Sequence, residues 1–191
     1  MENELPNRKP TRLRSFDYNN IGAYFITICT QNKQQILSRI VGGRRTTCFA
    51  SLDAPQNVKL LPYGKIAEKY LNQLNDFYSN IEIDQYVIMP NHIHIMLFVL
   101  DDGTVTNKTA CGFVERIACN SLTSPPTRQH SAVSQFVSTF KRFCNKEYGK
   151  NIWQRQFHDH IIRNRKDYEE HIKYIYDNPF RWCYDELYTE A

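Results

Sequence analysis

The stretch Met89–Leu97 reads MPNHIHIML, and its alternation organises the sequence around it. Side chains on a strand point to opposite faces in turn, so His92 and His94 share one face while the isoleucines between and after them share the other. The isoleucine face is apolar and can enter a core, which predicts a strand. The Pro90–Asn91 step interrupts the pattern, because proline lacks a backbone N–H and asparagine tolerates turn geometry.

Two predicted strands meet at that step, Ile81–Met89 (IEIDQYVIM) and His92–Val99 (HIHIMLFV). So short a break predicts an antiparallel pair or a kinked continuation of one strand. Ala23–Thr30 (AYFITICT) is rich in β-branched and aromatic residues, which predicts a further strand. Phe157–Arg163 predicts a short extended segment.

The remaining pattern adds a hairpin and helices. Arg39–Leu61 has polar turns and two β-prone pieces, near Thr46–Ala50 and Val58–Leu61, which predict a hairpin. Apolar residues at helical spacing predict amphipathic helices at Pro62–Tyr78, Ser131–Tyr148 and Arg165–Asn178. This order of elements is typical of an α+β fold, in which an antiparallel sheet carries helices mainly on one face.

Composition limits the class of protein. The chain has 191 residues, 41% of them hydrophobic, which suits a packed core and excludes wholesale disorder. The net charge of +4 admits a nucleic-acid partner without requiring one. No apolar run approaches the roughly 20 residues that cross a bilayer, which argues against a membrane partner. The cysteines are scattered and no apolar leader precedes them, so we expect a cytoplasmic protein with reduced thiols.

The length predicts a single domain over residues 1–191 with two irregular parts. Residues 1–15 are basic and contain two prolines, which predicts a flexible arm that is either solvated or in contact with phosphates. Residues 101–130 are polar and contain Pro125-Pro126, which predicts a variable insertion loop.

Two histidine pairs have the spacing of a metal chelate. His92 and His94, on one face of a strand, could each give one ring nitrogen to a divalent cation, or could lie on the solvated side of a half-exposed sheet. His158 and His160 repeat the spacing in a polar segment beside Arg155, where a structural or phosphate-contacting role is favoured. The first pair lies in an apolar strand, where polar side chains are costly unless they face a site. Spacing alone does not choose between the pairs.

The last predicted helix offers a candidate nucleophile. At about 100° per residue, its apolar stripe consists of Tyr168, Ile172, Ile175 and Tyr176. Tyr174 lies off that stripe, and Asn178 follows one turn later on nearly the same face. A tyrosine beside an amide oxygen that can bind metal could attack a substrate, but with 12 tyrosines in the chain an ordinary surface residue is the simpler interpretation.

Taken together, these stretches resemble the single-tyrosine HUH transposases of the insertion-sequence-200-like family, and most closely its REP-associated tyrosine transposases. The resemblance covers most of the chain in the family's order and weakens in 39–57 and 101–130. The stretches that carry it are YFITICTQNK (24–33), YVIMPNHIHIML (86–97), SQFVSTFKRFCNKEYG (134–149) and WQRQFHDHIIRNRKDYEEHIKYIYDNPFRW (153–182).

The resemblance implies a ferredoxin-like HUH nuclease fold and assigns roles to residues. His92 and His94 match the family's histidine pair, and Asn178 matches its third ligand for Mg²⁺ or Mn²⁺. Tyr174 matches the catalytic tyrosine, because it begins the element Y-I-x-x-N, which Tyr176 lacks. The second histidine pair falls outside the family's metal motif.

The implied activity is that of a metal-dependent single-stranded DNA endonuclease and strand transferase, which acts near REP-type (BIME-like) hairpins through a covalent 5′-phosphotyrosine. The implied assembly is a homodimer or a monomer. Cationic residues that could follow the phosphates are Arg12, Arg14, Lys141, Arg142, Lys146, Arg155, Arg163 and Arg165.

Two other functions remain open on the sequence. A basic, aromatic-rich α+β sheet also suits a module that binds hairpin DNA or RNA without cutting it. A metal hydrolase that uses water rather than tyrosine is the other alternative, and its cleavage would survive Tyr174→Phe.

Overall fold

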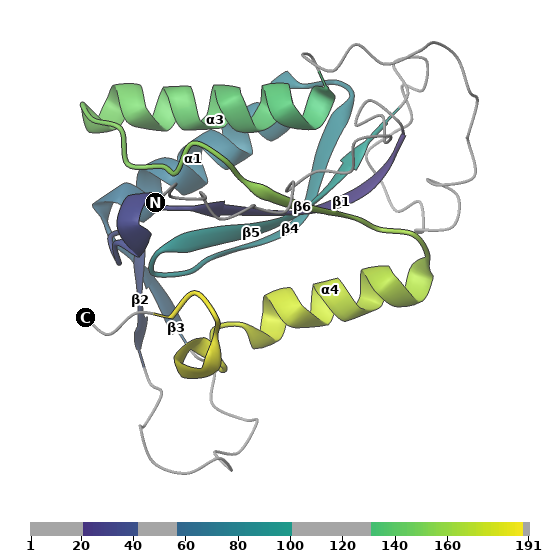
Figure 1. Cartoon of the computed structure of the whole chain (residues 1–191). Coiled ribbons are helices and arrows are strands. Elements are labelled where there is room, and N and C mark those ends of the chain that lie inside the picture. Colours follow the sequence, from purple (N-terminus) through teal and green to yellow (C-terminus); the bar gives the residue numbers. More distant parts are fainter. Residues whose placement is uncertain (1–20, 42–56, 101–130, 189–191) are drawn as a thin grey trace, which may run out of the picture.

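The computed structural model describes residues 21–41, 57–100 and 131–188. In these ranges a four-stranded sheet has the order β4-β5-β1-β6, and every neighbouring pair is antiparallel. Its strands are β1 (Gly22–Cys29), β4 (Ile81–Ile88), β5 (His92–Val99) and β6 (His158–Ile161). Figure 1 shows this sheet as the central layer of the molecule. The strands predicted from sequence are therefore confirmed, with ends that shift by one or two residues.

Strand β5 is central because it pairs with β4 on one side and β1 on the other. The Pro90–Asn91 step forms a tight reversal, in which the backbone N–H of Met89 donates to the carbonyl oxygen of His92 over 2.9 Å. The antiparallel alternative is therefore the correct one. In the register between β1 and β5, Thr27 lies opposite His94.

Helices cover both faces of the sheet. Helices α1 (Pro62–Phe77) and α3 (Ala132–Tyr148) lie together on one face, and α4 (Arg165–Asp177) lies on the other (Figure 1). The expectation of helices mainly on one face is met by α1 and α3.

The strand alternation divides the apolar residues into two cores. The isoleucines of β5 join the larger core with α1 and α3, whereas Phe25, Met96 and Ile175 belong to a smaller one under α4. His92 and His94, which share their face of β5 with Met96, therefore point toward α4.

Local signals set where the helices begin and end. Pro62 occupies the first turn of α1, where its missing N–H costs nothing. Ser131 caps α3 by accepting the N–H of Ser134 at 3.2 Å, and Gly149 ends that helix in the left-handed region with φ of 71°. Asn164 caps α4 by accepting the N–H of Asp167 at 2.9 Å.

A second, two-stranded antiparallel sheet confirms one of the two strands predicted for the hairpin over Arg39–Leu61. Strand β2 (Ser38–Val41) pairs with β3 (Asn57–Leu60). The piece near Val58–Leu61 is β3, whereas Thr46–Ala50 lies outside the described residues.

Short 3-10 turns η1 (Gln31–Lys33) and η2 (Trp182–Tyr184) follow β1 and α4. The predicted arm at 1–15 and the predicted loop at 101–130 both lie outside the described residues. Among the helices of the described ranges, none combines the length and apolarity of a membrane span.

Candidate metal centre and nucleophile

The first histidine pair is buried between the sheet and the segment that follows α4. His92 is 0% exposed and His94 is 3% exposed. The alternative that these are surface histidines on a solvated sheet is therefore wrong. A buried imidazole needs a partner for each ring nitrogen, so the contacts of the two rings show what they can do.

One nitrogen of each ring is held by a neighbouring polar side chain. Asn91 Oδ1 lies 2.8 Å from His92 Nδ1, and Thr27 Oγ1 lies 2.8 Å from His94 Nδ1. The Asn91 amide nitrogen donates to the backbone oxygens of Lys33 and Leu187, which assigns its oxygen to His92 as an acceptor. His92 Nδ1 therefore donates, which leaves the lone pair on Nε2.

Three buried ligand atoms remain without a partner. Among the described residues, His92 Nε2, His94 Nε2 and Asn178 Oδ1 are buried and form no hydrogen bond. Asn178 is 2% exposed, and it directly follows α4. Two neutral imidazoles and an amide oxygen are donors that a divalent cation accepts, so these residues fit the metal site that the resemblance implies.

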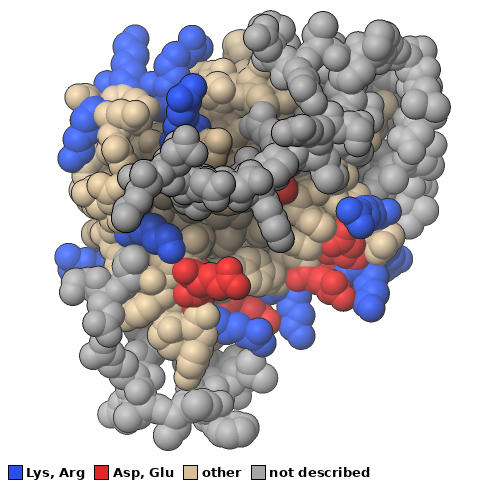
Figure 2. Space-filling model, viewed as in Figure 1, with Lys and Arg blue, Asp and Glu red and all other residues tan. Residues whose placement is uncertain are grey.

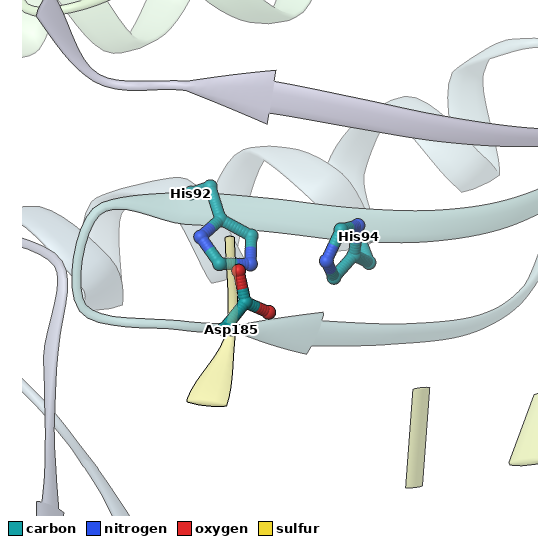
Figure 3. Close-up of side chains that lie close together, drawn as sticks. All are labelled: His92, His94 and Asp185. Atoms are coloured by element: carbon teal, nitrogen blue, oxygen red, sulfur yellow. The ribbon is translucent and has the colours of Figure 1, made fainter. Parts of the chain in front are cut away.

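Asp185 completes the polar cluster, and sequence reasoning missed it. Its side chain forms, with His92 and His94, a group whose ligand atoms all lie within 4.8 Å of one another. Figure 3 shows the two imidazoles on the same side of β5, with the Asp185 carboxylate beside them. Asp185 Oδ2 also accepts a hydrogen bond of 2.9 Å from the amide nitrogen of Asn178. That bond orients the amide so that Asn178 Oδ1 is left free to bind a cation.

The segment that carries Asp185 is held against the end of β5. The ring of Trp182 lies 5.8 Å from that of His92, and Asn91 donates to the carbonyl oxygen of Leu187 over 2.7 Å. Asp185 lies outside any periodic apolar pattern. Only the chain reversal after α4 brings it to the histidines, which explains why the sequence did not reveal it.

Burial keeps both imidazoles neutral. Burial, with a smaller contribution from the charge of Lys33, lowers the pKa of His92 from its ordinary value of 6.5 to about 3. Burial likewise lowers the pKa of His94 well below that value, and the nearby His92 adds to the effect. The neutral ring is the form that binds metal, so the pair is ready to act as ligands at neutral pH.

Tyr174 lies beside this cluster, half exposed. Its ring centre is 5.1 Å from that of His94, and its hydroxyl donates to Asp185 Oδ2 over 3.3 Å. Burial, followed by the charge and hydrogen bond of Asp185, raises the pKa of Tyr174 to about 12. The phenol is therefore protonated at neutral pH. An open cavity of about 540 Å³ gives access to it between α4, β1 and the segment around Asp185.

The structure corrects the predicted face of α4. Tyr176 is 58% exposed, so the prediction that it belongs to the apolar stripe is wrong. The side of α4 that contacts the sheet is centred on Ile175 and continues into the buried Asn178, the residue that caps the helix. Tyr176 is rotated away from Ile175 by about 100°. A stripe traced from apolar residues alone leaves out the buried polar Asn178 and wrongly includes the exposed Tyr176.

The second histidine pair does not join this cluster, although His158 lines the same cavity as His94 and Tyr174. His158 and His160 are exposed on the edge strand β6, and His160 contacts Asp167 of α4. The metal cluster of His92 and His94 does not include either of them.

Comparisons with known proteins place the chain among relatives. No family model matches the sequence. An uncharacterised protein of Haemophilus influenzae is 29% identical over 191 residues, which cover 97% of this chain and 96% of that protein. The REP-associated tyrosine transposase of Escherichia coli K12 is 30% identical over 100 residues, which cover 52% of this chain and 45% of that relative. The chain is a distant homologue of the REP-associated tyrosine transposases.

The fold agrees with this relationship. A solved structure of a REP-associated tyrosine transposase bound to a REP hairpin superposes with a TM-score of 0.53 at 19% identity, over 94% of this chain and 77% of that one. The expected α+β transposase fold is therefore confirmed. The match to the Escherichia coli REP-associated tyrosine transposase spans about half the length of that protein.

Within the described ranges, the cationic residues predicted to contact nucleic acid do not gather at the histidines. Arg12 and Arg14 lie outside the described residues. Lys141, with its neighbours Arg142 and Lys146, lies on α3, across the sheet from His92 and His94. Figure 2 shows Lys and Arg side chains in separate groups on the face drawn, with acidic side chains between groups.

Some of these cations already have protein partners. Lys141 donates to the backbone oxygens of Gln154 and Gln156, at 2.8 and 3.1 Å, and Arg165 pairs with Glu169 at 2.7 Å. Arg155 and Arg163 are exposed in the connections before β6 and α4. A role for any of these residues in binding DNA stays a prediction.

Proposed function

We propose that the protein is a metal-dependent single-stranded DNA endonuclease and strand transferase, which acts beside REP-type hairpins through a covalent 5′-phosphotyrosine. One observation supports this above all others. Three buried ligand atoms without partners, from His92, His94 and Asn178, lie next to an accessible tyrosine that is held by an acid. Buried polar atoms are normally hydrogen-bonded, so these open positions are ones that a bound cation would fill.

His92 Nε2, His94 Nε2 and Asn178 Oδ1 would hold Mg²⁺ or Mn²⁺, and two imidazoles favour Mn²⁺. When bound, such an ion neutralises charge on the scissile phosphate and stabilises the leaving 3′ oxygen. Thr27 and Asn91 fix the orientation of the two rings, and Asp185 fixes that of the Asn178 amide.

Tyr174 would supply the nucleophile. Its phenol oxygen forms a bond to phosphorus while the bond from phosphorus to the 3′ oxygen breaks. The phenol proton passes to Asp185 Oδ2, 3.3 Å away, and the departing oxygen takes up a proton to become a 3′-hydroxyl. Because the pKa of Tyr174 is about 12, a base of this kind is needed at neutral pH. The phosphotyrosine retains the bond energy, so a 3′-hydroxyl can later reverse the step and join strands.

The test uses the full chain, a labelled single strand that carries a hairpin, and Mn²⁺. We expect a covalent protein–DNA adduct that disappears in Tyr174→Phe and persists in Tyr176→Phe. The second variant is a matched control, because Tyr176 is exposed on the same helix. Cleavage that survives Tyr174→Phe would identify a hydrolase that uses water. Hairpin binding without any adduct, across metals and flanking sequences, would identify a binding module.

A further inference from the structure

A second polar cluster joins the edge strand β6 to the start of α4. It consists of His160 on β6 and of Asp167 and His171, which are four residues apart and therefore on one side of α4. The ligand atoms of these three residues all lie within 4.8 Å of one another. None of them belongs to the cluster around His92 and His94.

The distances within this cluster are close to those around a bound cation. His160 Nε2 lies 3.0 Å from both carboxylate oxygens of Asp167, and His171 Nδ1 lies 3.1 Å from Asp167 Oδ1. Two ligands on a tetrahedral Zn²⁺, each about 2.1 Å from it, are about 3.4 Å apart. The rings of His160 and His171 are stacked, with centroids 4.5 Å apart and planes 16° apart, so a cation could take the place of the hydrogen bonds in this cluster once one ring turns to direct its nitrogen at the ion.

Backbone hydrogen bonds hold Asp167, the central residue of this cluster, in place. Asp167 Oδ2 accepts the backbone N–H of Arg163 at 3.0 Å, while the N–H of Asp167 donates to Asn164 at 2.9 Å. Such outer contacts orient carboxylate ligands in metal sites. His171 Nδ1 also lies 2.8 Å from the carbonyl oxygen of Asp167, so binding of a cation there displaces a proton from that ring.

We propose that His160, Asp167 and His171 form a second cation site, which takes a transition-metal ion of the Zn²⁺ type. Two imidazoles and one carboxylate suit Zn²⁺ and discriminate against Mg²⁺, which prefers oxygen ligands. The side chain of His160 is 43% exposed, so water can reach the remaining coordination position.

The site would act as a clamp on the helix that carries Tyr174. A cation bound there ties β6 to the first two turns of α4, and Tyr174 follows His171 by less than one turn. The ring of His171 lies 4.8 Å from that of Phe25, which in turn lies 5.1 Å from that of His94. These packed rings connect the second site to the first, so the clamp would fix the position of α4 over the buried histidines.

The test counts Zn²⁺ bound to the metal-free full chain by calorimetric titration in excess Mg²⁺. We expect one more Zn²⁺ in the wild-type chain than in His160→Ala, and a rise in Tm with Zn²⁺ that His160→Ala reduces. His158→Ala is the matched control, because it removes an exposed imidazole two residues away on the same strand. It should bind as many Zn²⁺ ions as the wild type.

Equal Zn²⁺ stoichiometry in the wild type and His160→Ala would overturn the proposal, as would an equal loss in His158→Ala. A second measurement uses Co²⁺ in place of Zn²⁺ in His92→Ala, where the visible absorption of the remaining ion should persist and then vanish on adding His160→Ala. Neither measurement involves DNA, so the result is independent of the proposed strand transfer.

Discussion

The two His-x-His pairs of this protein have the same spacing and share one face of one sheet, yet their surroundings differ. In the sheet register, Thr27 of β1 lies between His94 on β5 and His158 on β6. The first pair lies on a central strand, where neighbours on both sides and the segment around Asp185 exclude water. The second lies on the edge strand, where both histidines are exposed.

This difference shows that spacing alone does not make a metal site. In the buried pair, one nitrogen of each ring is held by Asn91 or Thr27 and the other has no partner among the described residues. In the exposed pair, only His160 joins a cluster, and its partners are Asp167 and His171 of α4 rather than His158. Burial and outer hydrogen bonds orient the first pair and leave one nitrogen of each ring without a partner in the described ranges, which is why we propose this pair as the metal site.

The largest effect should come from removing an imidazole of the buried pair, compared with removing one of the exposed pair. His94→Ala should slow metal-dependent formation of the DNA adduct by about 10³-fold, because a lost ligand removes several kcal/mol of charge stabilisation at the phosphate. His160→Ala should slow it by less than about tenfold, because that ring does not touch the reacting atoms. Adduct formation followed on denaturing gels at saturating Mn²⁺ checks both rates. Equal losses would remove the distinction between the pairs.

Acid should destabilise the folded, metal-free protein because of its buried histidine pair. An unfolded histidine titrates near pH 6.5, whereas burial lowers the pKa of folded His92 to about 3. Between these values the unfolded chain binds a proton that the folded one does not. The free energy of unfolding is therefore unaffected by this group above pH 6.5 and falls as the pH decreases toward 3, by about 1.4 kcal/mol per pH unit for each such histidine.

Urea denaturation at several pH values between 7 and 4.5 measures this slope. His94→Gln should reduce it, because one of the two buried imidazoles is gone. His158→Ala should retain it, because that side chain is exposed on the edge strand. A free energy of unfolding that does not change over this range in the wild type would show that the first pair is not held neutral by burial.

A smaller effect should show whether Asp185 only orients Asn178 or binds the cation itself. Asp185→Ala removes the acceptor that orients Asn178 and should weaken Mn²⁺ binding by about 10- to 100-fold. Asp185→Asn can still accept that hydrogen bond, so its Mn²⁺ affinity should stay close to that of the wild type if Asp185 only positions Asn178. Calorimetric titration of the metal-free variants measures both. An equal loss in the two variants would make Asp185 itself a ligand.

The smallest effect is expected at Thr27. Thr27→Val keeps the shape of the side chain and removes the hydroxyl that contacts His94 Nδ1 at 2.8 Å. We expect Mn²⁺ binding to weaken by about tenfold, because the ring loses the contact that fixes its orientation. Unchanged affinity would show that packing against Phe25, 5.1 Å away, is sufficient to orient the ring.

The elements of the fold could be predicted closely, because their signals are local. Alternation marked β5, Pro90–Asn91 marked the reversal, and the caps Ser131 and Gly149 bounded α3. Patterns that rest on apolar residues alone were less reliable. Tyr176 was placed on the buried side of α4 because the polar Asn178, which is buried there, did not count toward the stripe.

The sequence by itself determined the candidate donors, His92, His94 and Asn178, and the candidate nucleophile, Tyr174. Periodicity offered these residues as candidates because it orients side chains within a single element, and the family resemblance then favoured them over the second histidine pair and Tyr176. Only the tertiary structure decided which histidine pair is buried and what surrounds it. Thr27 and Asp185 lie on other segments, and the sheet register and the reversal after α4 bring them to the site. Contacts between segments depend on how the whole chain packs, and no local pattern contains that information.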